Sequence, residues 1–180
     1  MTTFTSRLAL AALALGLSVA GLGAQQVTKQ EVAGIKNFAR LETTIACGGS
    51  TAPEAIAELR KMGFTSVFNL RMADEPGNDL AGEEAAAKAA GMRFIHIPFD
   101  VRKADPAVAD QFLAEIAKPG AQPAYIHCAG GGRAAAVWLI KRVLVDKWDL
   151  AKATKEAEDL GLAAAVVREY ALGYITAHTK

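Results

Sequence analysis

The chain has 180 residues, 52% of them hydrophobic, and 20 basic against 19 acidic side chains, which gives a formal net charge of +1. This length suits a single domain with its own core, and two cysteines are too few for a disulfide scaffold. The balanced charge gives no electrostatic reason to expect nucleic acid as a partner. The mean hydropathy of +0.18 raises the question of a membrane segment.

The N-terminal segment has the order of a secretory signal peptide. Arg7 precedes an uncharged run of sixteen residues, 8–23, and small residues follow. This run is rich in Ala and Gly and is short for a membrane span, which needs about twenty residues. We therefore predict a signal peptide over residues 1–24, cleaved after Ala20 or Ala24. The mature protein is then expected in the bacterial periplasm or the medium, with no membrane association.

The segment 25–36 is polar and is predicted to be a flexible lead-in to a single domain over 37–180. Residues 41–47 are rich in β-branched side chains and precede two glycines, which predicts a strand and a turn. Thr51 and Glu54 have the spacing of a capping box and predict the start of a helix that ends at Gly63.

Apolar strands and helices alternate through the rest of the chain. Strands are predicted over residues 65–70, 92–98 and 123–127, and helices over 80–90, 106–118, 133–146, 150–160 and 163–178. Continuous apolar strands separated by helices indicate a parallel sheet that is buried on both faces. We predict an α/β fold of three layers, in which helices flank a mostly parallel central sheet and further helices follow at the C-terminus.

The segment 124–134, AYIHCAGGGRA, concentrates the residues suited to chemistry. A strand ends at His127, Cys128 and three glycines follow, and Arg133 opens a helix. Glycines permit backbone angles at which successive N–H groups turn inward and form an anion-binding nest. The N-terminus of the next helix favours negative charge, and Arg133 adds a planar, two-pronged donor.

A cysteine beside such donors loses its proton readily, and the thiolate is the form that attacks an electrophile. The alternative for Cys128 is an inert, packed thiol beside an ordinary glycine-rich turn. The coincidence of the glycines, the arginine and the strand-to-helix junction favours a nucleophile. The sequence holds no CxxC or HxxxH pattern, so we expect neither a metal nor a cofactor.

The segment from His127 to Arg133 resembles the phosphate-binding loop of cysteine-dependent phosphatases. From about residue 37 to 162, the chain is similar to the small bacterial dual-specificity-phosphatase-like family, also called beta-lactamase-hydrolase-like phosphatase domains. The matching residues are Asn37-Phe38, Gly48-Gly49-Ser50, Pro53, Val67-Phe68-Asn69-Leu70-Arg71, Glu75, His96-Ile97-Pro98 and the 128–133 loop. The resemblance implies hydrolysis of a phosphorylated substrate, a protein or a small phosphate monoester, through a phospho-cysteine.

The same resemblance implies roles for individual residues. Cys128 is the nucleophile, and the phosphoryl oxygens are bound by Ala129, Gly130, Gly131, Gly132 and Arg133. Asp100, 28 residues before Cys128, is the preferred proton donor to the leaving group. Its competitor Asp105 precedes a proline and is better explained as a helix cap.

Three further residues are candidates with open alternatives. His127 orients the loop, or is a packed strand residue. Arg71 contacts the substrate, or forms a structural ion pair with Asp74 or Glu75. Cys47 is a possible redox partner of Cys128, since a disulfide between them would block the nucleophile reversibly in an oxidising compartment.

The sequence departs from the usual phosphatase pattern at two positions. Only four residues separate Cys128 from Arg133, where typical protein phosphatases have five, and Ala134 stands where many have Ser or Thr. Four is also the spacing of rhodanese-type sulfurtransferases, and it occurs within the bacterial family named above. A sulfurtransferase that carries a persulfide on Cys128, and an anion-binding module without turnover, are therefore the alternatives.

Overall fold

A computed structural model describes residues 26–179, and one six-stranded sheet organises them. The strands are β1 (Val27–Lys29), β2 (Ala39–Leu41), β3 (Ile45–Gly48), β4 (Ser66–Asn69), β5 (Arg93–His96) and β6 (Ala124–His127). Their order is β1-β2-β3-β6-β4-β5. The last four strands in this order are parallel, and β1 and β2 add an antiparallel edge. The prediction of a mostly parallel α/β sheet is confirmed.

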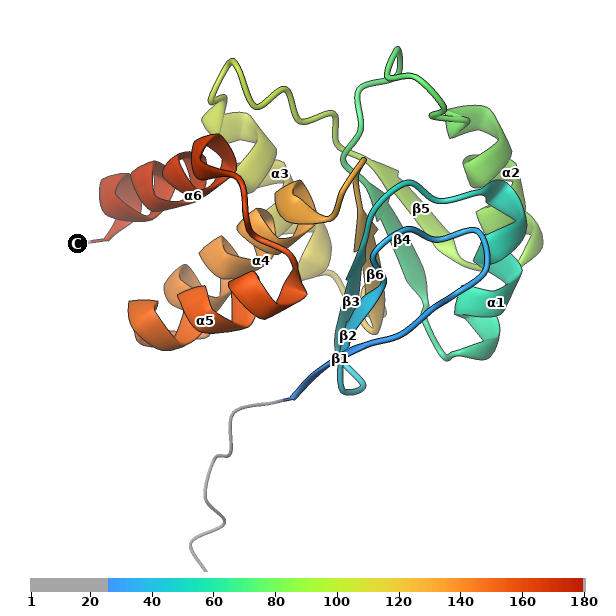
Figure 1. Cartoon of the computed structure of the whole chain (residues 1–180), viewed down its shortest axis with the longest axis horizontal. Helices are drawn as coiled ribbons and strands as arrows, with labels where there is room; N and C mark the ends of the chain where they lie inside the picture. Colours follow the sequence, from blue (N-terminus) through green and yellow to red (C-terminus); the bar gives the residue numbers. More distant parts are fainter. Residues whose placement is uncertain (1–25, 180) are drawn as a thin grey trace, which may run out of the picture.

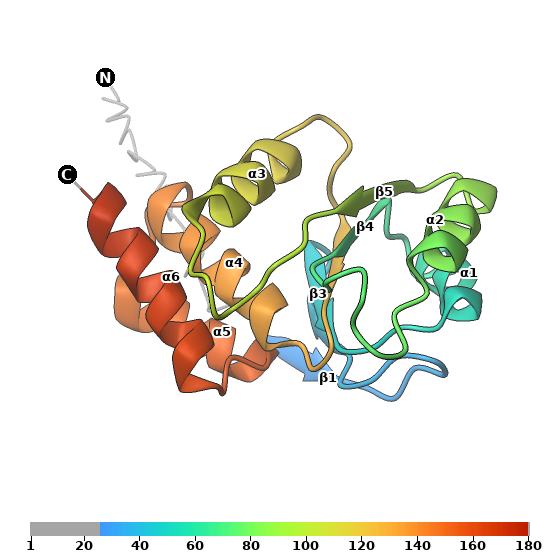
Figure 2. The ribbon, with the colours of Figure 1, turned by 90° about the horizontal axis from the view of Figure 1, so that it is seen from above.

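Helices cover both faces of this sheet. They are the 3-10 helix η1 (Pro53–Ala55) and the α-helices α1 (Ile56–Lys61), α2 (Leu80–Ala89), α3 (Pro106–Ile116), α4 (Gly132–Leu144), α5 (Leu150–Leu160) and α6 (Ala165–His178). Figures 1 and 2 show α1 and α2 on one face and α3 to α6 on the other, which makes three layers. Within residues 26–179, no helix has the length and apolar character that a membrane crossing requires.

Two hydrophobic cores lie on the two faces of the sheet. The core under α3 to α6 includes Trp138 and Phe112, and the core under α1 and α2 includes Phe64 and Tyr125. Every residue of β3, β4 and β6 is buried, as expected of strands covered on both faces. Because β6 lies between β3 and β4, the chain leaves the middle of the sheet at Cys128.

The strand predicted over residues 41–47 is instead a hairpin. Leu41 ends β2 and pairs with Ile45 at the start of β3. Glu42 takes a left-handed backbone angle (φ 42°), and Thr44 N donates to Leu41 O at 3.1 Å, which closes the turn. The β-branched run in the sequence concealed a turn that contains no glycine or proline.

The prediction of a flexible lead-in over 25–36 is wrong for the described part of that segment. Val27 in β1 pairs with Leu41 of β2, and Ile35 forms a β-bridge with Thr51. Ile35 is only 7% exposed, so apolar contact as well as strand pairing fixes this segment. Residue 25 and the signal peptide predicted over 1–24 lie outside the described residues.

The predicted capping box at Thr51 is also wrong. Thr51 Oγ1 donates to Gly49 O at 3.0 Å and shares a hydrogen bond of 2.7 Å with the hydroxyl of Tyr125. The helix begins one residue later, without a side-chain cap, at the 3-10 turn of Pro53. By contrast, the predicted cap at Asp105 is confirmed, because its carboxylate accepts from Ala107 N at 2.9 Å.

Candidate active site

Cys128 lies at the carboxyl end of the central strand β6 and is 2% exposed. Its own N–H donates to Gly48 O at 3.2 Å, which ties it to the neighbouring strand. Gly131 N donates to Cys128 Sγ at 3.1 Å, so one amide of the loop already faces the sulfur. Gly131 takes a left-handed angle (φ 103°) immediately before α4, a conformation that favours glycine.

Two neighbouring segments hold the carbonyl groups of this loop. Ser50 donates to Ala129 O through both its backbone N, at 3.1 Å, and its Oγ, at 3.2 Å. Asn37 Nδ2 donates to Gly130 O at 3.1 Å. These bonds occupy carbonyl groups that would otherwise repel an anion. Only the family resemblance singled out Asn37 and Ser50 in the sequence. Their contacts join distant parts of the chain, so no local pattern could indicate them.

Arg133 is held by a carboxylate that the sequence suggested only as a partner of Arg71. Its Nη1 and Nη2 donate to the two oxygens of Glu75 at 2.6 and 2.8 Å, and Nη1 also donates to Phe99 O at 2.9 Å. Burial opposes ionisation of Glu75, but the hydrogen bonds from Arg133 and from Met72 N outweigh it and lower the pKa to about 2. This clamp on Arg133 therefore persists at neutral pH and is lost only as the pH falls toward that value.

Arg71 does not reach the substrate side of the site, so its prediction as an anion-binding residue is wrong. Its side chain is 2% exposed, and its Nη1 and Nη2 donate to the carbonyl groups of Gly77 and Pro76. Its Nε donates to Glu75 at 3.3 Å. The alternative of a structural ion pair is confirmed, and Arg71 supports the loop that presents Glu75.

Asp100 lines the same cavity as Cys128 and Arg133. Arg102 binds both of its oxygens, at 2.8 Å through Nε and at 2.9 Å through Nη2. These hydrogen bonds lower the pKa of Asp100 to about 2, so the carboxylate is ionised in this arrangement. Asp105 is occupied as the cap of α3 and is not among the residues that line the cavity.

His127 points away from the cavity, toward α2. Its ring stacks on Tyr125 with centroids 5.4 Å apart, and its Nε2 lies 3.0 Å from Glu83 Oε2. Both His127 and Glu83 have no exposed surface. Sequence reasoning missed Glu83, because the alanines around it and the adjacent Glu84 gave no sign that this one carboxylate is buried.

Cys47 and Cys128 are both free thiols in buried positions. Cys47 on β3 pairs with Ile126 on β6, and Ile126 precedes Cys128 by two residues. Both cysteines belong to the same hydrophobic core. Burial raises the pKa of the Cys47 thiol well above its ordinary value, and the nearby Cys128 adds to this effect. Cys47 is therefore a neutral thiol near neutral pH, and its role as a redox partner stays a prediction.

The cavity in front of Cys128 has a volume of about 600 Å³. The predicted residues that line it are Asp100, Cys128, Ala129, Gly130, Gly132 and Arg133. Apolar side chains of Val101, Val166 and Val167 form part of its wall. Within residues 26–179, no three His, Cys, Asp or Glu side chains are grouped as metal ligands.

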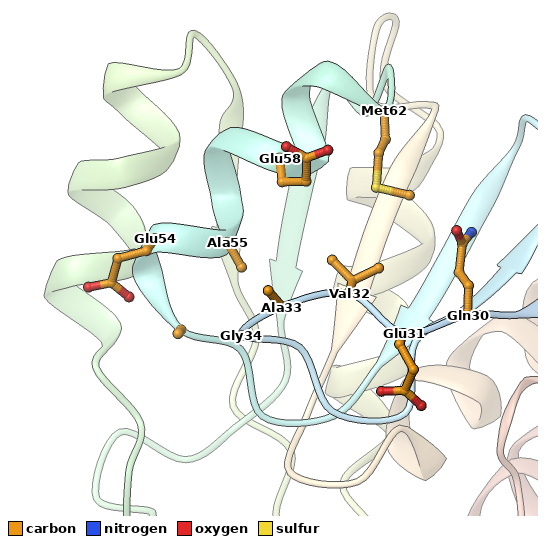
Figure 3. A pocket seen from close by; sticks show the side chains of 10 residues that line it. Gln30, Glu31, Val32, Ala33, Gly34, Glu54, Ala55, Glu58 and Met62 are labelled. Carbon is orange, nitrogen blue, oxygen red and sulfur yellow. The ribbon is translucent and has the colours of Figure 1, made fainter.

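A second cavity, of about 630 Å³, lies between the N-terminal segment 30–34 and the η1–α1 segment. Figure 3 shows that its labelled side chains come from these two segments, with Glu54 and Glu58 on one side and Glu31 on the other. It contains none of the residues predicted for the site, and no basic side chain from residues 26–179 lines it. It is separate from the cavity of Cys128.

A sequence profile of one family matches residues 37–145, more than half of the chain. The family is described as "Beta-lactamase hydrolase-like protein, phosphatase-like domain". The chain belongs to this family. The resemblance inferred from the sequence is therefore confirmed, and the protein is a cysteine-phosphatase-like enzyme by family. No curated protein sequence matches the chain significantly.

Two solved structures illustrate the likeness in fold. TpbA of P. aeruginosa is 18% identical, with a TM-score of 0.65 over 87% of this chain and 92% of TpbA. The core catalytic domain of the S. cerevisiae PP-IP phosphatase SIW14 is 19% identical, with a TM-score of 0.62 over 79% of this chain and 87% of that domain. At these identities the likeness establishes the fold alone.

Proposed function

We propose that this protein is an exported phosphatase that hydrolyses phosphate monoesters through a phospho-cysteine on Cys128. The observation that carries the proposal is the placement of the Cys128 sulfur. It accepts a hydrogen bond from the amide of Gly131 and shares a cavity with Arg133, which Glu75 holds in place. Donors fixed in this way can stabilise the charge that develops on phosphoryl oxygens without rearranging during the reaction.

In the proposed first step, the thiolate of Cys128 attacks phosphorus. An S–P bond forms, the bond from phosphorus to the ester oxygen breaks, and Asp100 gives a proton to that oxygen. In the second step, Asp100 takes a proton from water, which attacks the phospho-cysteine. The S–P bond then breaks, inorganic phosphate leaves, and the thiolate is restored.

Asp100 can act as the donor only when it is protonated, so Arg102 must release it. The Arg102 side chain is 83% exposed and is free of packing that would hold it in place. An entering phosphate dianion offers Arg102 a competing, two-pronged partner. We therefore propose that Arg102 leaves Asp100 when the substrate binds.

The walls of the cavity support a substrate with a single phosphate on an apolar group. TpbA has been solved in complex with pTyr, whereas SIW14 is described as a PP-IP phosphatase. Among the described residues, two basic side chains line the cavity of the present protein, Arg102 and Arg133, and each already has a carboxylate partner. A substrate with several phosphates would need additional cations, so a singly phosphorylated, apolar ester fits better.

The test compares reduced mature protein with its Cys128→Ser variant on an aryl phosphate and on thiosulfate with cyanide. Release of phosphate that is lost in the variant is the expected result. Formation of thiocyanate instead would favour the sulfurtransferase suggested by the short loop. Tight binding of vanadate without either reaction would favour an anion-binding module.

Export is tested separately, by expressing the whole chain in a bacterium and fractionating the cells. We expect a shortened protein in the periplasm or medium, with an N-terminus that follows Ala20 or Ala24. Full-length protein confined to the cytosol would contradict the signal peptide.

A further inference from the structure

A buried acid and base lie on the face of the sheet opposite to Cys128. Glu83 on α2 and His127 at the end of β6 have no exposed surface, and Oε2 and Nε2 are 3.0 Å apart. Successive side chains of a strand point to opposite faces, so His127 faces α2 while Cys128 lies in the core under α4. Neither Glu83 nor His127 takes part in the two chemical steps proposed above.

The hydrogen bonding of this pair is incomplete. Within the described part of the chain, Glu83 Oε1 and His127 Nδ1 have no hydrogen-bond partner, and Nε2 is not aligned on Oε2 as a hydrogen bond requires. Natural proteins leave few buried polar atoms in this state, because each costs stability. Packing alone would favour an apolar residue here, as at Ala87, the other buried residue of α2. Packing therefore does not explain a carboxylate at this position.

Glu83 has a second contact that explains its position better. Its Oε2 also accepts from Asn69 Nδ2 at 2.9 Å, and Asn69 is the residue paired with His127 across β4 and β6. One carboxylate oxygen thus contacts side chains at the ends of two neighbouring strands. Asn69 is further bound to the next segment, through Arg71 N at 2.8 Å and Asn78 Oδ1 at 3.1 Å.

Each of these strand ends leads to one half of the active site. β6 continues directly from His127 into Cys128. β4 continues into residues 71–78, the loop whose Glu75 holds Arg133. Glu83 therefore joins the segment that carries the nucleophile to the segment that orients the arginine.

We propose that Glu83 is a positioning residue that fixes the location of Cys128 relative to Arg133 by holding His127 and Asn69. Loss of its carboxylate frees the two strand ends to shift, without removing any group that touches the substrate. A displacement of about 1 Å between reacting groups can cost about 100-fold in rate. The kinetic part of this inference rests on the proposed phosphatase function.

The experiment compares Glu83→Gln with Glu84→Gln, which changes the adjacent, exposed carboxylate of the same helix. We expect Glu83→Gln to lower kcat on an aryl phosphate about 10- to 100-fold, with a smaller change in KM, and Glu84→Gln to change neither. Both variants should keep a cooperative thermal melt. If Glu83→Gln does not fold, Glu83→Met, which leaves no unpaired polar atom on α2, takes its place with the same expectation.

A double-variant comparison tests whether Glu83 acts through His127. If it does, Glu83→Gln combined with His127→Asn lowers kcat no further than the worse of the two single changes, because both interrupt one chain of contacts. If the decreases in kcat of the two single variants multiply in the double variant, Glu83 and His127 act independently. That result would refute the proposal that Glu83 acts through His127.

Vanadate affinity provides a readout that needs no turnover. We expect Glu83→Gln to bind vanadate about tenfold more weakly than the wild type, as for one misplaced hydrogen bond to a charged group, and Glu84→Gln to match the wild type. If the wild type binds vanadate but releases no phosphate, the proposed phosphatase function is refuted. The vanadate affinities of the two variants then still decide whether Glu83 positions the site. Wild-type kcat and vanadate affinity in folded Glu83→Gln would refute the positioning role.

Discussion

Arg102 sets the protonation state of Asp100, the side chain proposed as proton donor. With Arg102 bound to both carboxylate oxygens, the pKa of Asp100 is lowered to about 2. A carboxyl group donates a proton only in its protonated form, which predominates below its pKa. Catalysis that depends on Asp100 should therefore respond to any change that removes Arg102.

We predict that Arg102→Gln shifts the limb of the kcat/KM pH profile that is governed by Asp100 upward by about two pH units on phenyl phosphate. Without the arginine, the pKa of Asp100 returns toward about 3.9, and a larger fraction of it is protonated at any pH above that value. The measurement is the pH profile of kcat/KM, because this ratio reports the ionisation of the free enzyme, in which Arg102 still binds Asp100. An unchanged profile in Arg102→Gln would contradict the coupling of the two residues.

Asp100→Asn is the companion prediction. It should lower kcat on phenyl phosphate by about 100- to 10,000-fold, the usual contribution of a general acid, and cancel the effect of Arg102→Gln. The loss should be smaller on p-nitrophenyl phosphate, whose leaving group needs little protonation. Equal losses on both esters would remove Asp100 from the proton transfer.

At the scale of the elements, the junction of β6 and α4 depends on the backbone angle of Gly131. Its φ of 103° is one that other residues adopt only with strain, whereas a Cβ at Gly130 would meet no atom within 4 Å. We predict that Gly131→Ala costs about 1–2 kcal/mol of unfolding free energy and that Gly130→Ala costs much less. Urea unfolding of the two variants measures this difference. Equal midpoints would show that the loop relaxes without strain.

The sequence predicted this junction well because its information is local. The strand, Cys128, the glycines and Arg133 are contiguous, and each has a known conformational or chemical use. The partners of this segment were not predictable in the same way. Glu75 is 58 residues from Arg133 in the sequence. Thr51 is 74 residues from Tyr125, and the Thr51 hydroxyl bonds to the Tyr125 hydroxyl and does not cap the helix. No periodicity or spacing in the sequence encodes such contacts.

Short elements with mixed patterns also limited the prediction of the fold. The β-branched run before Gly48 looks like one strand because nothing in it marks the turn at Glu42. The lead-in looks flexible because β1 has only three residues and gains its order from pairing with β2. The long helices and the buried parallel strands were predicted correctly, since their patterns extend over many residues.

In the molecule as a whole, the C-terminal helices α5 and α6 pack on the same core as the segment that the family profile matches. The family profile stops at residue 145, yet α5 and α6 supply buried side chains to the core around α4. Trp138 of α4 is fully buried and donates to Glu156 of α5 at 2.8 Å. The C-terminal helices therefore complete the core around α4, beyond the end of the family profile.

We predict that a chain truncated after residue 145 does not fold cooperatively, because it exposes the apolar face of α4. Circular dichroism during heating measures this, with the chain that ends at residue 179 as the control. A sharp thermal transition in the truncated chain would contradict the view that α5 and α6 belong to the same cooperative unit.

Capture of the phospho-cysteine would test the proposed phosphatase reaction at its key intermediate. Reduced protein is mixed with an aryl phosphate, quenched within milliseconds in acid, digested and analysed by mass spectrometry. We predict one phosphoryl group on the peptide that contains Cys128, more of it in Asp100→Asn because water attack is slowed, and none in Cys128→Ser. Phosphate release by the wild type with no phosphoryl group on Cys128, or with full activity in Cys128→Ser, would contradict the proposed reaction.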